Sequence, residues 1–169
     1  MSNAELLAQW NAEKQIRRCM HQYMRLCDEL GPGSDLDALM SLFAADATWE
    51  GLGKRYKKTF GRYVGCAAIR QMFAGYTREP GHFLMNIHFL GNEDIDVTDA
   101  TATASWLLMQ PSDFTDGRSQ LSCARLSVSF IYRHEQWLIQ HFTTENIFSR
   151  PMASPWDNTA ELPVPDKND

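Results

Sequence analysis

Helix-forming and strand-forming sequence are segregated along this chain, and that order constrains the fold more than any other feature. The first 76 residues contain the helical periodicities, interrupted by strand candidates at residues 47–52 and 59–64. The sequence from there to residue 148 is strand-like and has no helical period. Its four strand segments are residues 82–90, 95–110, 119–133 and 136–148. A Rossmann fold would alternate strands with helices, whereas segregated helices and antiparallel hairpins predict an α+β fold.

Three helices are expected in the first half of the chain. The longest covers residues 4–29, where apolar side chains recur at spacings of three and four. This stripe is Ile16, Cys19, Met20, Tyr23, Leu26, Cys27 and Leu30. Gly31-Pro32-Gly33-Ser34 ends it, and Ser34 or Asp35 can cap a second helix over residues 36–43. A third is expected over residues 66–76, whereas the basic residues 54–58 are interpreted as a hairpin turn.

The 169 residues are enough for one domain with a substantial core. We expect that domain to cover residues 1–150. Four prolines and many polar residues follow, which predicts an irregular arm over residues 151–169, part of which docks through Trp156. The strand breaks are expected at Gly91-Asn92, Pro111-Ser112-Asp113 and His134-Glu135.

Charge and cysteine content exclude several classes of function. The net charge of −5 and the lack of a basic stripe argue against nucleic acid or an anionic membrane as a partner. The four cysteines form no C-x-x-C pair, which argues against a zinc ribbon or a dithiol redox site. The N-terminus has no apolar signal segment, and we expect a cytoplasmic protein.

The stretch "HFLMNIHFL" at residues 82–90 is the most informative strand. Side chains alternate between the two faces of a strand. One face is then plain core, made of Phe83, Met85, Ile87 and Phe89. The other face combines leucines with polar groups, in the order His82, Leu84, Asn86, His88 and Leu90. The two histidines would lie about 20 Å apart, too far to share a metal ion, and no metal site is expected.

Several stretches, in this order and spacing, resemble SnoaL-like proteins of the nuclear-transport-factor-two-like superfamily. They are "QIRRCMHQYMRLCDE", "DLDALMSLFAADATWEG", "VGCAAIRQMF", "GHFLMNIHF" and "EQWLIQHFTTENIF", between residues 10 and 150. The resemblance implies a cone-shaped α+β fold. In it, a strongly curved, mixed but mostly antiparallel sheet wraps around a long N-terminal helix and two shorter helices. The cone would enclose a mainly apolar pocket.

Within the superfamily, the chain most resembles the branch of scytalone dehydratase and bile-acid 7α-dehydratase. This resemblance implies a catalytic set of Tyr23, Asp28 and His82. In those enzymes a histidine at the start of the strand after the third helix is the general base. An aspartate at the end of the long helix pairs with it, and in the bile-acid enzyme a tyrosine stands five residues earlier. On an ideal helix Asp28 lies about 140° around from Tyr23, so the two converge only if the helix unwinds near Leu30.

Four further residues are candidates for substrate binding: Asn86, His88, Trp49 and Arg125. Asn86 can hydrogen-bond a substrate oxygen, whereas His88 is interpreted first as a buried histidine with satisfied nitrogens. Arg125 lies on the polar face of its strand, where it can anchor an anionic group or form a salt bridge at an interface.

The resemblance implies a lyase or isomerase of the dehydratase type that needs no cofactor. Its substrate would be a small, largely apolar, cyclic hydroxy-ketone such as a steroid or polyketide. The alternative is a non-catalytic member, either a ligand-binding protein or the small subunit of a ring-hydroxylating dioxygenase. By analogy with the superfamily, a homodimer or homotrimer is expected.

Overall fold

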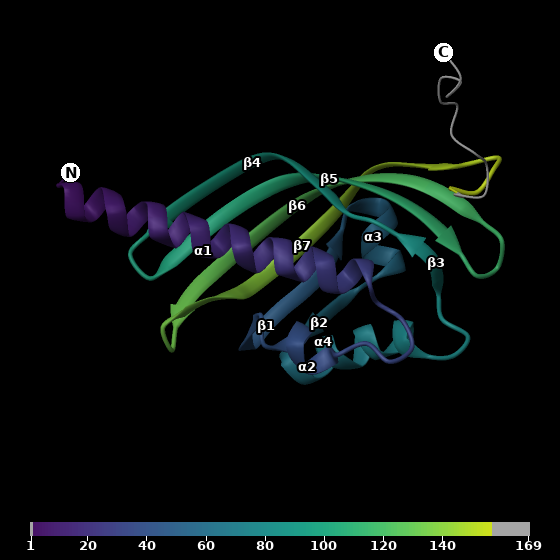
Figure 1. Cartoon of the computed structure of the whole chain (residues 1–169), viewed down its shortest axis with the longest axis horizontal. Coiled ribbons are helices and arrows are strands. Elements are labelled where there is room, and N and C mark those ends of the chain that lie inside the picture. The colour runs from purple at the N-terminus through teal and green to yellow at the C-terminus, as the bar shows by residue number, and fades with distance from the viewer. Residues whose placement is uncertain (1, 157–169) are drawn as a thin grey trace, which may run out of the picture.

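The computed structural model describes residues 2–156 and contains an open, seven-stranded sheet packed against a long N-terminal helix (Figure 1). The helices are α1 (Asn3–Asp28), α2 (Leu36–Met40), α3 (Gly53–Thr59) and α4 (Cys66–Ala74), and a 3₁₀ turn spans Gly75–Thr77. The strands are β1 (Phe43–Leu52), β2 (Arg62–Val64), β3 (Phe83–Asn86), β4 (Phe89–Thr98), β5 (Thr101–Phe114), β6 (Ser119–Arg133) and β7 (Gln136–Pro151). The predicted α+β class is confirmed.

The sheet is mixed but mostly antiparallel, as predicted. Its strand order is β2-β1-β7-β6-β5-β3, and β4 also pairs with β5. Only the β1–β7 pair is parallel among the strands of residues 2–156. In Figure 1, α1 runs across one face of the curved sheet, and α2 and α4 lie together below the C-terminal end of α1.

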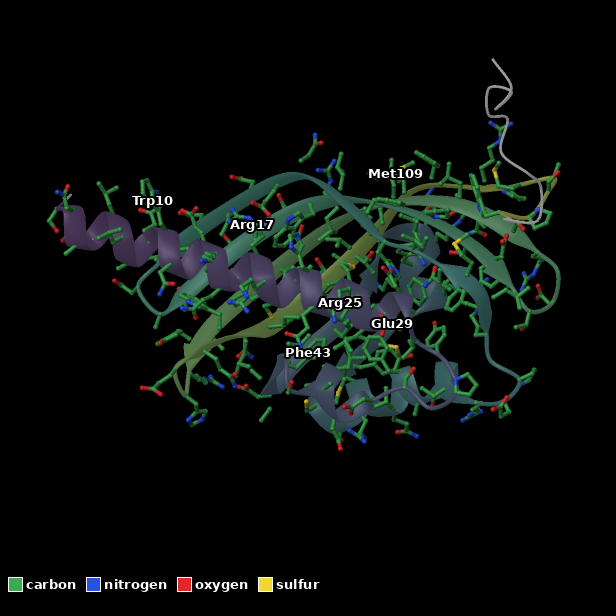
Figure 2. All side chains as sticks on the ribbon, viewed as in Figure 1. Trp10, Arg17, Arg25, Glu29, Phe43 and Met109 are labelled. Carbon is green, nitrogen blue, oxygen red and sulfur yellow. The ribbon has the colours of Figure 1, made fainter. Side chains whose placement is uncertain are left out.

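Helix α1 forms where the apolar stripe predicted it. Ser2 and Glu5 form a reciprocal capping box at its N-terminus, and Asp28 is its last residue. Arg17 donates two hydrogen bonds to Glu93 of β4, at 2.8 and 2.6 Å, and Trp106 of β5 donates to the other oxygen of that carboxylate. These bonds tie the middle of the helix to the sheet, while Trp10 lies exposed near its free end (Figure 2).

The strand boundaries at residues 82–114 differ from the prediction. β3 and β4 both pair with one edge of β5, and their register is continuous, because Asn86 faces Ser112 and Phe89 faces Met109. The expected single strand is therefore interrupted only at Ile87 and His88. β4 continues through the expected turn at Gly91-Asn92. A register shift there leaves Asn92 at a φ of 50°, so the chain forms a bulge rather than a turn.

The next two breaks have different outcomes. The break expected at Pro111-Ser112-Asp113 does not occur, because β5 runs through Pro111 to Phe114. The hairpin between β4 and β5 turns earlier in the chain, at Asp99-Ala100. The predicted turn at His134-Glu135 is confirmed, with both residues at positive φ. Beyond β7, the backbone amide of Trp156 donates to Asp113 at 3.1 Å, so this part of the chain docks. The rest of the predicted arm, residues 157–169, lies outside the described residues, and the proposed domain boundary stays a prediction.

The basic segment at residues 54–58 is helical, and the prediction of a hairpin turn is wrong. The prediction relied on the charged residues and overlooked an apolar pair with helical spacing, Tyr56 and Phe60. The rings of this pair lie 4.8 Å apart. Phe60 also contacts the ring of Trp49 at 5.6 Å, so burying this pair against the sheet favours the helix over a turn. The helix approaches β1 so closely that a Cβ at Gly51 would lie 2.4 Å from the carbonyl oxygen of Tyr56.

The two faces of the sheet have different surroundings. Leu108 and Leu126 face α1 and are buried. Met109 is exposed on the opposite face, as are Phe89 and Phe148, and Met109 lies at the margin of the molecule away from α1 in Figure 2. None of the helices within residues 2–156 is both long and apolar enough to cross a membrane.

Replacing Gly51 with alanine should lower the free energy of unfolding by about 1–3 kcal/mol, because the new Cβ overlaps the backbone of α3. The matched control is Gly75→Ala, at a helical φ of −60° with nothing within 4 Å of its Cβ position. That change should be neutral or add up to about 1 kcal/mol, by restricting the unfolded chain. Urea unfolding monitored by circular dichroism measures both. Equal free energies of unfolding for the two variants would contradict the close approach.

Candidate active site

A cavity of about 630 Å³ lies between α1, α3, α4 and the inner face of the sheet. One part of its wall is aromatic: Tyr23, Trp49, Tyr56, Phe60, Phe73, Tyr76, Phe83, Phe114 and Phe142. Another part carries amides and hydroxyls: Asn86, Gln110, Ser112, Gln120, Ser122, Thr144 and Ser149. The cavity therefore offers both a surface for flat rings and a set of hydrogen-bonding groups.

The most distinctive polar contact at the cavity is between Asp28 and His88. One carboxylate oxygen, Oδ1 of Asp28, lies 2.6 Å from the ring Nδ1 of His88 and 2.9 Å from its backbone nitrogen. Because the carboxylate accepts the Nδ1 proton, the neutral ring carries its lone pair on Nε2. The side chain of His88 is 11% exposed and lines the cavity. Within residues 2–156, Nε2 has no hydrogen-bond partner, and it is open to a ligand.

The pairing of Asp28 with His88 corrects the expectation that this carboxylate binds His82. The edge position of this strand explains it, because Ile87 donates to Pro111 of β5 and the N–H of His88 therefore points away from β5, toward the end of α1. Helix α1 does not have to unwind, because His88 lies within hydrogen-bonding distance of Asp28 at the end of the regular helix. Helical geometry runs to Asp28, and Tyr23 stays on the buried stripe.

His82 lies elsewhere on the cavity wall, at an exposed position near Tyr76 and Phe114. A register shift between Phe83 and Met85 separates it from the alternating run that follows. Phe83 therefore faces the cavity, while Leu84 is 73% exposed. Alternation holds after this bulge, so Asn86 and His88 do share the cavity face.

The face expected to be plain core is not buried. Ile87 and Phe89 are 38% and 58% exposed, because they point to the outer side of the sheet edge. The predicted polar face is thus the inner face, and part of the predicted apolar face is solvent-exposed.

Tyr23 and Trp49 form a buried hydrogen bond in the aromatic part of the wall. The indole Nε1 of Trp49 donates to the hydroxyl of Tyr23 at 3.0 Å, and Phe142 stacks on the indole with ring centroids 5.6 Å apart. Burial raises the pKa of Tyr23 well above its ordinary value, with the neighbouring Cys27 thiol adding to the shift. The hydroxyl therefore stays protonated at neutral pH and, having accepted from Trp49, can donate its own proton.

Asn86 is buried and is held by two neighbours on β5. Its Oδ1 accepts from Gln110 Nε2 at 2.8 Å and from Ser112 Oγ at 2.7 Å. This fixes the amide with its Nδ2 toward the cavity, where it has no partner within residues 2–156. The sequence prediction missed Gln110, Ser112, Ser122 and Ser149, which line the cavity. The expected strand breaks at Pro111 and after Phe148 concealed Ser112 and Ser149, whereas Ser122 was missed because the opposite face of its strand, with Arg125, was expected to bind the substrate.

Arg125 does not reach the cavity. It is exposed, and its neighbours Ala124 and Leu126 point inward, so Arg125 lies on the outer face of the sheet. A second pair of a histidine and a carboxylate lies on that face, where Nε2 of His141 is 2.7 Å from Oε1 of Glu50. Among residues 2–156, no three side chains of histidine, cysteine, aspartate or glutamate come together in a way that could hold a metal ion.

The sequence matches the profile of the SnoaL-like domain family over residues 8–143, most of the chain. No curated protein sequence matches it. Solved structures with the same fold share few residues with it. A putative aromatic ring hydroxylase from Novosphingobium aromaticivorans is 20% identical, with a TM-score of 0.72 over 84% of this chain and 94% of the other.

Two further relatives show how widely this fold is shared. A putative scytalone dehydratase from the same organism is 16% identical, with a TM-score of 0.71 over 95% of this chain and 100% of the other. A hexachlorocyclohexane dehydrochlorinase, LinA-type3 from Novosphingobium barchaimii, is also 16% identical, with a TM-score of 0.68 over 97% and 100% of the two chains. The predicted resemblance to SnoaL-like proteins is confirmed.

The cavity cysteine should be a poor nucleophile. Burial raises the pKa of the Cys27 thiol to about 12. Burial also raises the pKa of Cys66, but that thiol is only partly buried. Iodoacetamide at about pH 8 should therefore label Cys66 first, and labelling of Cys27 should rise about tenfold per pH unit toward pH 10, because only the thiolate reacts.

Mass spectrometry of the digested protein measures both labelling rates. Denatured protein, in which both thiols are exposed, is the control and should label both at similar rates. Equal labelling of Cys27 and Cys66 in the folded protein at about pH 8 would show that burial does not protect Cys27.

Proposed function

The chain belongs to the SnoaL-like domain family, and we propose that this member is a cofactor-independent lyase or isomerase of the dehydratase type. The observation that carries the proposal is the Asp28–His88 pair, which presents an unpartnered imidazole nitrogen to a cavity large enough for a ring compound. A base with a fixed tautomer beside a ligand-sized cavity is the arrangement that proton abstraction from carbon requires.

In the proposed elimination, Nε2 of His88 removes a proton from the carbon next to a substrate carbonyl. The imidazolium that forms is stabilised by the Asp28 carboxylate on Nδ1. The electron pair from the C–H bond moves toward the carbonyl oxygen and forms an enolate. The enolate then expels the hydroxyl group on the next carbon, which takes the proton from His88 and leaves as water. His88 thus serves as base and then as acid.

Two donors are available for the enolate oxygen. They are the protonated Tyr23 hydroxyl and the Nδ2 amide of Asn86, because both residues line the cavity and neighbouring side chains hold each in place. Donors that are fixed before reaction stabilise developing charge without further reorganisation. Tyr23 and Asp28 therefore keep the roles expected of them, while the role of base moves from His82 to His88.

The cavity walls support a cyclic hydroxy-ketone, such as a polyketide or a steroid, as the substrate. The aromatic wall suits the flat or folded carbon skeleton, and the amide and hydroxyl wall suits the oxygen substituents. Two relatives of the same fold are named for eliminations, one of water and one of hydrogen chloride, which supports an elimination rather than a transfer reaction.

Association into homodimers or homotrimers stays a prediction, as does the cytoplasmic location. Phe89, Met109 and Phe148 lie in one row across the outer face of the sheet: Phe89 faces Met109 on the next strand, and Cys123 of β6 lies between Met109 and Phe148. All three are at least 37% exposed. An apolar stripe of this kind is consistent with packing between sheets of two copies.

Replacing His88 with glutamine should lower kcat by about 10²–10⁴-fold, because the general base is lost. Asp28→Asn should lower kcat as well, by weakening the orientation of the ring and its charged form. The assay is a panel of cyclic β-hydroxyketones, with formation of the conjugated enone followed by ultraviolet absorbance.

His82→Gln is the matched control, since that histidine also lines the cavity but does not bind Asp28. It should keep most of kcat, and circular dichroism should show all three variants folded. Full activity in the folded His88→Gln protein would reject the mechanism, and loss of activity in His82→Gln alone would return the role of base to His82.

A further inference from the structure

The only cation on the wall of the cavity belongs to α3, among the residues that the structure describes. Four of the seven residues of this helix are basic and none is acidic, in a chain whose net charge is −5. They are Lys54, Arg55, Lys57 and Lys58. Within residues 2–156, none of the four forms an ion pair. The carboxylate of Glu145 lies beside Gly53 at the start of α3, but it forms no ion pair with any of the four cations.

Of the four cations, only Arg55 lines the cavity. The cavity is lined by Arg55, Tyr56, Thr59 and Phe60, which occupy one side of α3 at spacings of one and four residues. Lys57 lies about 200° around the helix from Arg55, and neither it nor the other two lysines lines the cavity. Arg55 is therefore the cation placed to contact a ligand, and the lysines add to the surrounding positive potential.

The helix that carries Arg55 is firmly held. Tyr56 is buried, and its carbonyl oxygen approaches Gly51 of β1. The amide of Gly51 donates to Gly61 beyond the helix at 2.9 Å. The backbone of Arg55 is therefore fixed relative to the cavity, and the ordering cost of binding falls on one side chain rather than on a loop.

We propose that the cavity binds a ligand with an acidic group, a carboxylate, sulfonate or phosphate, and that Arg55 binds this group at the edge of the cavity. A guanidinium suits it because its planar donors can pair with two oxygens of an anion. The identification of this ligand as the substrate rests on the proposed function, whereas the anion site itself does not. The ligand would then be a ring compound with its oxygen substituents toward the amides and its acidic arm toward α3.

Two fluorescent probes of similar size separate charge from apolar binding. Anilinonaphthalene sulfonate carries an anion, and N-phenyl-naphthylamine is its neutral counterpart. The wild-type protein should bind the sulfonate about fivefold more tightly, the upper range for an exposed ion pair. Added salt should reduce this preference by screening.

Arg55→Gln should remove the preference and leave the affinity for the neutral probe unchanged, while Arg55→Lys should retain part of it. Lys57→Gln removes the same charge from the other side of the helix and should keep the preference. Equal binding of the two probes by the wild type, no binding of the sulfonate, or equal effects of Arg55→Gln and Lys57→Gln would overturn the proposal. Circular dichroism checks that each variant is folded.

The result is separable from the catalytic proposal. His88→Gln should lose turnover and still prefer the sulfonate. A preference for the sulfonate in a protein that turns over no hydroxy-ketone would leave the anion site standing and reject the lyase. Turnover that depends on His88, without any preference for the sulfonate, would support the lyase and reject the anion site.

Discussion

The arrangement of the site depends on one carboxylate that binds a single residue twice. Asp28 accepts hydrogen bonds from the backbone and the ring of His88, so the end of α1 and the interruption between β3 and β4 have to meet. Ile87 donates to Pro111 of β5, so the N–H of the next residue, His88, points away from β5, where the carboxylate accepts it. The ring bond then sets the tautomer and leaves Nε2 facing the cavity. The unpaired edge of this strand thus lets one carboxylate bind both the backbone and the ring of the histidine.

Much of this could be predicted from the sequence, because periodicity reports burial directly. The stripe on α1 predicted the helix, and alternation correctly placed Asn86 and His88 on one face. It failed at His82, because a bulge at Leu84 shifts the register by one residue, and a bulge leaves no clear mark in a run of apolar residues. Resemblance to the family's strand start therefore selected His82 as the partner of Asp28, whereas the carboxylate binds the histidine six residues later.

The other wrong predictions have a similar cause, because contacts between residues far apart in the sequence determined the local secondary structure. The basic residues 54–58 resemble a solvated turn until Tyr56 and Phe60 are seen to pack against Trp49. Pro111 resembles a strand break, yet β5 continues through it. Proline lacks only the N–H, and its carbonyl oxygen still accepts from Ile87 at the sheet edge. Both errors hid cavity residues, namely Arg55 on the helix and Ser112 after the proline.

His88 could instead be a structural histidine, and the hydrogen bonds separate the two interpretations. A buried histidine that serves stability alone is expected to have partners for both ring nitrogens, because an unpaired polar atom costs free energy. His141 on the outer face is a surface-exposed case, bound to Glu50 by Nε2 with its side chain 41% exposed. His88 is more buried, its Nδ1 is bound to Asp28, it lines the cavity, and its Nε2 has no protein partner within residues 2–156. The same holds for Asn86, whose oxygen is used twice while its Nδ2 faces the cavity. Two neighbouring polar groups without protein partners on the wall of one cavity are the arrangement that the proposed substrate site requires.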